Sequence, residues 1–118
     1  MTLPNLWQFC NDEFRYSAWI ANRSPKAMIE DLKAEINELE RALESKDRAA
    51  VLEEAGDVFK DALTLFIGVH RLYGASPESG IRRVYEKFSK RKPHVVLKSA
   101  VPLHLERYFW REAKRKQD

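Results

Sequence analysis

Several features are scarce in this 118-residue sequence, and each scarcity excludes something. Cys10 is the only cysteine, so an internal disulfide is excluded and a reducing cytoplasm is the expected location. The longest apolar run, residues 62–69, is far shorter than the roughly 20 residues of a membrane span, so no membrane partner is expected. The N-terminus lacks a basic region followed by an apolar run, and we expect no signal peptide. Glycine and proline are few, and no repeat or low-complexity segment is present.

What remains is a sequence typical of one soluble, helix-rich domain. Hydrophobic residues make up 44% and charged residues 33% of the chain. We therefore expect a single domain over residues 1–118, with a core of about 4–92 and a basic C-terminal extension over 93–118. The charge is uneven: residues 1–80 have a balance of −5 and residues 81–118 a balance of +8. This asymmetry is compatible with a nucleic-acid tail, or with a carboxylate site beside a phosphate-binding cluster.

The spacing of apolar residues predicts an all-α fold of four to five helices. Ser24-Pro25 and Ser76-Pro77 each read as an N-cap followed by proline at the first helical position. Ser45 or Asp47 is expected to cap the helix after the turn at 45–47. The segment 95–97 is short and could be extended. The expected helices run over about 4–22, 25–44, 48–73, 77–91 and 103–116.

Two pairs of carboxylates flank the turn at residues 45–47. Glu35 and Glu38 are spaced i, i+3 and project from one helix face, and Glu54 and Asp57 repeat this spacing on the next helix. In an antiparallel hairpin, Glu38 and Glu54 would each lie about 10 Å from the turn, and Glu35 and Asp57 about 15 Å from it, at ~1.5 Å per residue. The two pairs should therefore lie level with each other.

Four carboxylates this close cannot all remain ionised and unpaired, because like charges raise one another's pKa. A hard divalent cation relieves the repulsion, and oxygen ligands select Mg²⁺, Mn²⁺ or Ca²⁺ over zinc. The alternative is a solvated helix face, since glutamate is common on exposed helices. Residue spacing by itself leaves both interpretations open.

The sequence resembles the MazG-like all-α nucleoside triphosphate pyrophosphohydrolases over roughly residues 5–92. The resemblance rests on Glu-x-x-Glu at 35–38 followed by Glu-x-x-Asp at 54–57. It extends through Gly-Ala-Ser-Pro-Glu at 74–78 to Glu-Lys-Phe at 86–88 with Arg91. Small members carried by integrons and phages are the most similar in size.

The resemblance implies Mg²⁺-dependent hydrolysis of (deoxy)nucleoside triphosphates to a monophosphate and pyrophosphate, as nucleotide-pool house-cleaning. The four carboxylates would bind Mg²⁺, with Mn²⁺ as a substitute, and Glu35 or Glu38 would act as general base. Lys87 and Arg91 would bind the triphosphate. A homodimer or homotetramer is expected, with the hairpin helices joining a larger bundle.

Four further positions bear on the base and sugar of the substrate. Relatives place an aromatic residue against the nucleobase near Trp19, although a Trp at helical spacing also fits a core position. Asp61, one turn beyond Asp57, would be a further ligand, an acceptor for an exocyclic amino group, or a surface acid paired with a lysine. Tyr85 and Thr64 stand where the family commonly has asparagine.

Two other functions fit parts of the sequence. Phosphoribosyl-ATP pyrophosphohydrolases share the expected fold and metal chemistry. A helical interaction module without enzymatic activity would instead have the acids as a solvated face and the basic C-terminal segment against a partner. Nucleic acid is not an expected partner, because short basic runs such as 90–92 and 114–116 are usually solvated.

Overall fold

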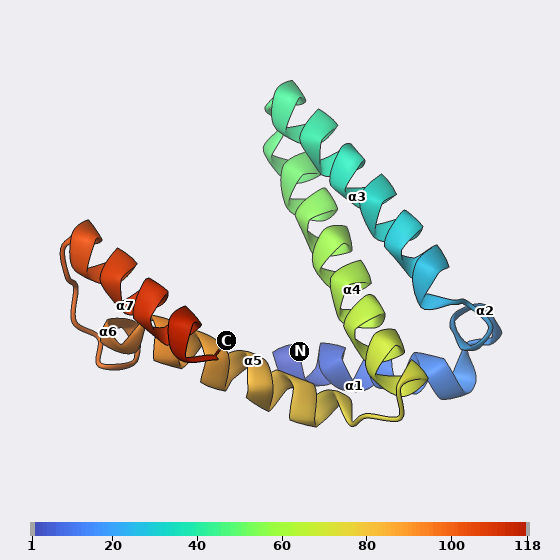
Figure 1. The fold of residues 1–118 in the computed structure, drawn as a ribbon. Helices are drawn as coiled ribbons and strands as arrows, with labels where there is room; N and C mark the ends of the chain where they lie inside the picture. The colour runs from blue at the N-terminus through green and yellow to red at the C-terminus, as the bar shows by residue number, and fades with distance from the viewer. Residues whose placement is uncertain (1, 118) are drawn as a thin grey trace. The chain divides into compact units, whose positions relative to one another are not determined.

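The computed structural model describes residues 2–117 and contains only helices and connecting segments in this range (Figure 1). The predicted all-α class is confirmed. Seven helices are present in the described residues instead of four to five, because α2 and α6 are additional single turns. The helices are α1 (Leu3–Tyr16), α2 (Ala18–Ala21), α3 (Pro25–Ser45), α4 (Arg48–Leu72), α5 (Pro77–Arg91), α6 (Pro93–Val96) and α7 (Leu103–Gln117).

The chain divides into two compact units at Pro77. The N-terminal unit contains α1 to α4, and the C-terminal unit begins at Glu78 and contains the rest of α5 with α6 and α7. None of the helices formed by residues 2–117 is long and apolar enough to cross a membrane.

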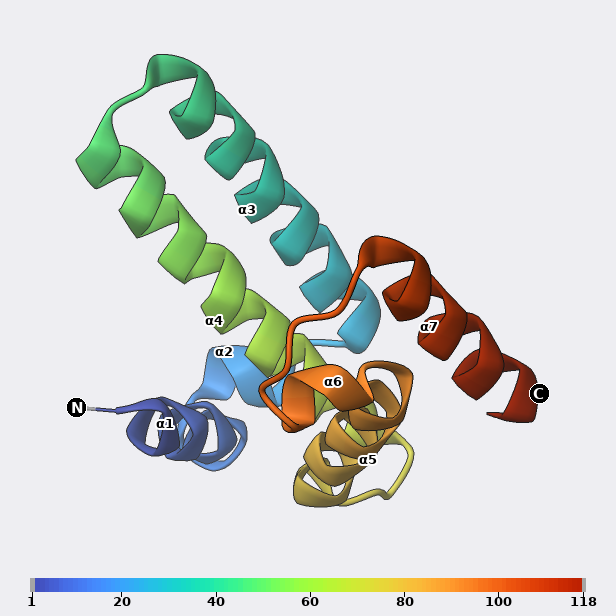
Figure 2. The same cartoon turned by 90° about the vertical axis from the view of Figure 1, so that its left-hand side faces the viewer.

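Helices α3 and α4 form the antiparallel hairpin on which the acidic residues were predicted, and they lie side by side in Figures 1 and 2. As predicted, the Ser24 hydroxyl caps α3, where it accepts the backbone N–H of Ala27. Lys46 ends α3 in the left-handed conformation with φ of 60°. Asp47 then caps α4 by accepting the N–H groups two and three residues further on. These local contacts set the length of both helices relative to the turn.

The predicted first helix over 4–22 is divided in two. Ser17 has extended backbone angles, and its hydroxyl accepts the N–H of Ile20 at 3.4 Å. A serine side chain can replace a helical hydrogen bond in this way, which ends one helix and begins another. The apolar spacing continues through Ser17, so the pattern alone does not reveal the break. As a result, Trp19 belongs to the short helix α2 and not to a continuation of α1.

The core of the N-terminal unit lies where α1, α3 and α4 meet. Cys10, Met28 and Ile67 are its most buried apolar residues. Gly68 allows α3 to approach closely, because a Cβ at this position would lie 2.8 Å from the Met28 sulfur. The Phe14 ring closes the same contact from α1. This packing anchors the end of the hairpin that is remote from its turn.

The C-terminal unit is built around aromatic and basic side chains. The Phe88 and Trp110 rings join α5 to α7, with centroids 5.7 Å apart. The expectation of an extended segment over 95–97 was wrong, because residues 93–96 form α6. Pro93 takes the first position of this turn, where its missing N–H costs nothing.

Candidate active site

The hairpin brings carboxylates from both of its helices together. Glu35 on α3 and Glu54 and Asp57 on α4 each offer an oxygen, and these three oxygens all lie within 4.8 Å of one another. Glu35 and Glu54 are half-buried and Asp57 is exposed. We call these three residues the acidic group. Glu35 and Asp57 are the two residues predicted to lie level with each other, and Glu54 is one helical turn closer to the turn of the hairpin.

The carboxylates around Glu35 repel its negative charge. Burial raises the pKa of the Glu35 carboxyl, and the charges of Asp57, Asp61, Glu54 and Glu38 raise it further. No cation of the protein is among the causes that shift this pKa. A divalent cation would therefore relieve an unfavourable charge arrangement already present in the fold.

The fourth predicted ligand, Glu38, is not one of the three converging residues. Its carboxylate accepts a hydrogen bond from Nη1 of Arg41 at 2.6 Å, one turn further along α3. Both side chains are largely exposed, so this ion pair is weak and easily exchanged for another partner. Glu38 remains close enough to contribute to the raised pKa of Glu35.

A cavity of about 350 Å³ opens beside the acidic group within the N-terminal unit. Glu35 belongs to both, so the cavity and the acidic group are continuous. The predicted residues Trp19 and Asp61 line it, as does Thr64. Its full lining consists of Glu13, Trp19, Ile20, Met28, Asp31, Ala34, Glu35, Lys60, Asp61 and Thr64.

Two ion pairs involve residues that line this cavity. Neither pair could be predicted from the spacing of residues in the sequence. Lys60 on α4 contacts Glu13 on α1 at 2.5 Å. Arg23 donates two hydrogen bonds of 2.5 Å to the Asp31 carboxylate, and this pairing holds the pKa of Asp31 below its ordinary value. The first pair joins helices distant in sequence, and the second follows the irregular segment before α3. Neither therefore has a periodic signal.

Asp61 is not the lysine-paired surface acid that was one of its alternatives. The neighbouring lysine, Lys60, is engaged with Glu13, and Asp61 forms no hydrogen bond or ion pair with any other residue in 2–117. Asp61 is half-buried, and this burial is the main cause that raises its pKa, followed by the negative charges of Asp31, Asp57 and Glu13, with Lys60 opposing them.

The predicted triphosphate-binding residues Lys87 and Arg91 both lie on α5 in the C-terminal unit. Lys87 is exposed. Arg91 is only 8% exposed, and its guanidinium carbon lies 4.7 Å from the Trp110 ring centroid and 5.6 Å from that of Phe88. Tyr85, which replaces the family's common asparagine, is exposed on the same helix. The roles of Lys87 and Arg91 toward phosphate stay predictions.

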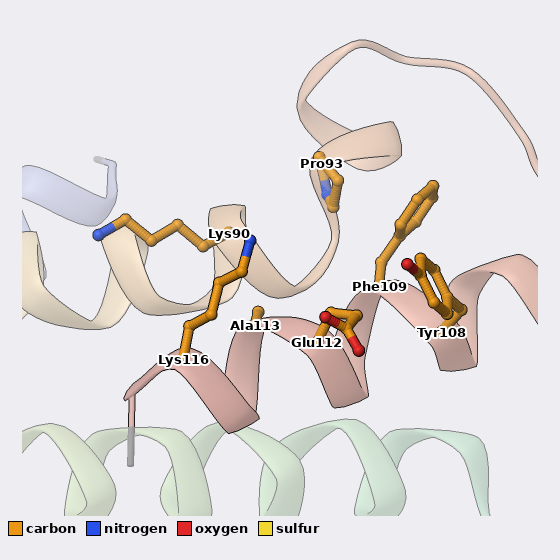
Figure 3. A pocket seen from close by; sticks show the side chains of 7 residues that line it. All are labelled: Lys90, Pro93, Tyr108, Phe109, Glu112, Ala113 and Lys116. Atoms are coloured by element: carbon orange, nitrogen blue, oxygen red, sulfur yellow. The ribbon is translucent and has the colours of Figure 1, made fainter.

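The C-terminal unit also contains a cavity, of about 590 Å³. Figure 3 shows Lys90 and Lys116 toward one end of it and the rings of Tyr108 and Phe109 toward the other. Glu112 lies between them. This cavity has one acidic residue in its lining, whereas the smaller cavity of the N-terminal unit adjoins three converging carboxylates.

The geometry defines a class of protein, an all-α domain with clustered carboxylates on a helical hairpin. Residues 23–96 match the MazG nucleotide pyrophosphohydrolase domain, and the chain belongs to this family. The crystal structure of a mazG-related protein from Thermotoga maritima is similar, with a TM-score of 0.86 and 32% sequence identity. That match covers 96% of this chain and 99% of the other. A comparison with curated proteins gave no match.

Proposed function

We propose that this protein hydrolyses nucleoside triphosphates between the α and β phosphates, with Mg²⁺ as its metal and Mn²⁺ as a substitute. One observation carries the proposal: in a MazG-family chain, Glu35, Glu54 and Asp57 converge beside a cavity lined by Trp19. The family supports nucleotide pyrophosphohydrolase activity in general. The acidic group supports a metal, and the adjoining cavity supports a place for the nucleoside.

The donor set suits a hard cation. All three side chains offer carboxylate oxygens, which Mg²⁺ and Mn²⁺ prefer, and no histidine or cysteine belongs to the group. Oxygens on opposite sides of one Mg²⁺ lie about 4.2 Å apart, given a bond length of about 2.1 Å. A separation of up to 4.8 Å therefore closes with small rotations of these side chains. Glu38 would join as a fourth ligand by leaving the exposed Arg41.

A divalent cation held by the acidic group would neutralise phosphate charge and acidify a water molecule. Glu35 or Glu38 would accept the proton of the water molecule whose oxygen attacks the α phosphorus. The bond between the α phosphorus and the bridging oxygen then breaks, and pyrophosphate leaves. Lys87 and Arg91 would stabilise the charge on the leaving group.

We also propose that the protein works as a homodimer or homotetramer. The hairpin exposes large apolar side chains, including Ile36, Leu43 and Leu52. An apolar groove on the N-terminal unit is lined mainly by Leu3, Leu6, Phe9 and Phe59. Apolar surfaces of this kind commonly mark interfaces between protein subunits.

A substrate panel tests the activity. Purified protein is incubated with each of the eight common (d)NTPs and with phosphoribosyl-ATP, and pyrophosphate release is measured with Mg²⁺, with Mn²⁺ and with EDTA. We expect metal-dependent release of pyrophosphate and monophosphate from one or more nucleoside triphosphates. Turnover of phosphoribosyl-ATP alone would assign the other activity of this fold. Absence of turnover throughout would favour the interaction module and reject the proposal.

A further inference from the structure

Four carboxylates line the cavity beside the acidic group, and two of them, Glu35 and Asp61, form no hydrogen bond or ion pair within residues 2–117. Glu35 belongs to the acidic group, so Asp61 is the one outside that group. Glu13 is paired with Lys60 and Asp31 with Arg23. Asp61 faces the same cavity, yet within residues 2–117 no side chain or backbone group donates to it. A half-buried carboxylate in this situation gains free energy from any ligand that supplies an N–H donor.

The rest of the lining suits a flat ring. Trp19 lines the cavity, and the Arg23 guanidinium covers its ring at 4.5 Å from the centroid. Ile20 and Met28 add apolar surface. The Thr64 hydroxyl donates to the backbone carbonyl of Lys60 at 3.1 Å, so its one proton is already engaged. The Thr64 residue is only 4% exposed, so outside the acidic group Asp61 is the acceptor in the lining that a ligand's donor can reach.

The position of Glu35 links this cavity to the phosphates. Because Glu35 belongs to both the acidic group and the cavity, a triphosphate bound at the acidic group would have its nucleoside beside Trp19 and Asp61. Resting on the proposed function, we propose that Asp61 selects nucleoside triphosphates whose base carries an exocyclic amino group and rejects the matching oxo bases.

The selection follows from the chemistry of the two groups. An ionised carboxylate has acceptor oxygens only, so it pairs with the amino group of cytosine or adenine. Uracil and hypoxanthine have a carbonyl oxygen in the same place, and two acceptors facing each other repel. The neighbouring ring N–H of these bases would reach Asp61 only if the base shifted away from the position that the amino bases take. Hydrogen bonds to a charged partner discriminate by roughly 10- to 100-fold. The ring carbon and nitrogen skeletons of each pair are the same, and only the oxo member carries a hydrogen on the neighbouring ring nitrogen, so the apolar walls do not distinguish the two.

The first test uses matched pairs of substrates with the wild-type protein. The kcat/KM for dCTP is compared with that for dUTP, and that for dATP with that for dITP. We expect the amino member of at least one pair to be favoured about 10- to 100-fold. Equal values within both pairs, or a preference for the oxo members, would overturn the assignment of Asp61 while leaving the hydrolytic function intact.

The second test changes the acceptor. In Asp61→Asn the amide can rotate to present either its N–H or its carbonyl, so the amino-to-oxo ratio should fall to about threefold or less. Asp12→Asn makes the same chemical change on the exposed side of α1, where Asp12 contacts Gln8, and should keep the wild-type ratio. An unchanged ratio in Asp61→Asn is the result that rejects Asp61 as the selecting residue.

A binding measurement separates the two proposals. Calorimetry with the α,β-imido analogues of dCTP, dUTP, dATP and dITP in the presence of Mg²⁺ reports selection without turnover. Tighter binding of the amino member of either pair, lost in Asp61→Asn, supports the selection even if no triphosphate is hydrolysed, and the proposed activity alone would then fail. Equal affinity within both pairs, or binding of none of the four, overturns the selection.

Discussion

The N-terminal and C-terminal units of this chain differ in both the sign and the pairing of their charges. Residues 1–77 contain 13 Asp and Glu against 9 Lys and Arg, whereas residues 78–118 contain 5 against 12. In the N-terminal unit, Glu35 and Asp61 have raised pKa values because burial and neighbouring acids oppose their ionisation. In the C-terminal unit, Glu106 and Glu112 have lowered pKa values, chiefly from hydrogen bonds donated by Lys92 and Arg115.

This difference indicates where a ligand would change the free energy most. In the C-terminal unit, Glu106 and Glu112 already have partners, and Arg91 is buried against Trp110. The acidic group of the N-terminal unit has no cation within it. Charged groups that lack a partner in the fold therefore indicate a binding site better than the number of charged residues in a region does.

The largest expected effect comes from removing one member of the acidic group. Asp57→Asn should lower pyrophosphate release by about 10³-fold or more, because a divalent cation contributes several kcal/mol to stabilising the transition state. Far-ultraviolet circular dichroism should stay helical, since Asp57 is exposed. Glu53→Gln is the matched control: this exposed acid on the same helix is outside the group and should retain activity. Comparable turnover in wild type and Asp57→Asn would remove the acidic group from the mechanism.

An intermediate effect should distinguish the two cations of α5. Lys87→Ala should raise the KM for a nucleoside triphosphate about 10-fold through the loss of one charged contact to phosphate, without changing the melting temperature. Arg91→Ala should in addition lower the free energy of unfolding by about 2 kcal/mol, because the packing of the Arg91 side chain on two aromatic rings is lost. Steady-state kinetics and urea unfolding measure the two effects. Equal losses of stability in both variants would contradict this division of roles.

The smallest expected effect is a pH dependence of opposite sign in the two units. The folded-state pKa of Asp61 is raised above its ordinary value of 3.8, so ionised Asp61 disfavours folding. Without metal, Asp61→Asn should therefore melt at a higher temperature than wild type at neutral pH. This gain should vanish as the pH falls through the folded pKa and below the ordinary one.

Glu106 supplies the contrast. Its pKa is lowered by the hydrogen bond from Lys92, so it stabilises folding above its ordinary pKa of 4.5 and loses this contribution as the pH falls through the lowered value. Glu106→Gln should melt below wild type at neutral pH and converge with it in acid. Melting curves from about pH 3 to pH 7 measure both variants. If both variants melted above wild type at neutral pH, or both below it, the two units would not differ in how their charges are compensated.

Much of the hairpin could be predicted because its determinants are local. Ser24 with Pro25 and the turn before Asp47 are recognisable within a few residues, and they set the helix lengths. Equal distances from this turn then place Glu35 level with Asp57. Trp19 and Asp61, which the sequence predicts to lie near the base, line the cavity, and their roles stay predictions. The break at Ser17 was missed because apolar residues keep their spacing on both sides of it.

The sequence by itself determined the hairpin of α3 and α4, its caps and the level of the two acidic pairs, since these depend on hydrogen bonds and spacings within a few residues. Only the tertiary structure decided which acids are neutralised. The pairing of Lys60 with Glu13 depends on how α1 packs on α4, and among residues 2–117 Asp61 has no ion pair of its own. The convergence of Glu35, Glu54 and Asp57, and the engagement of Glu38 by Arg41, likewise depend on side-chain positions that no periodicity encodes.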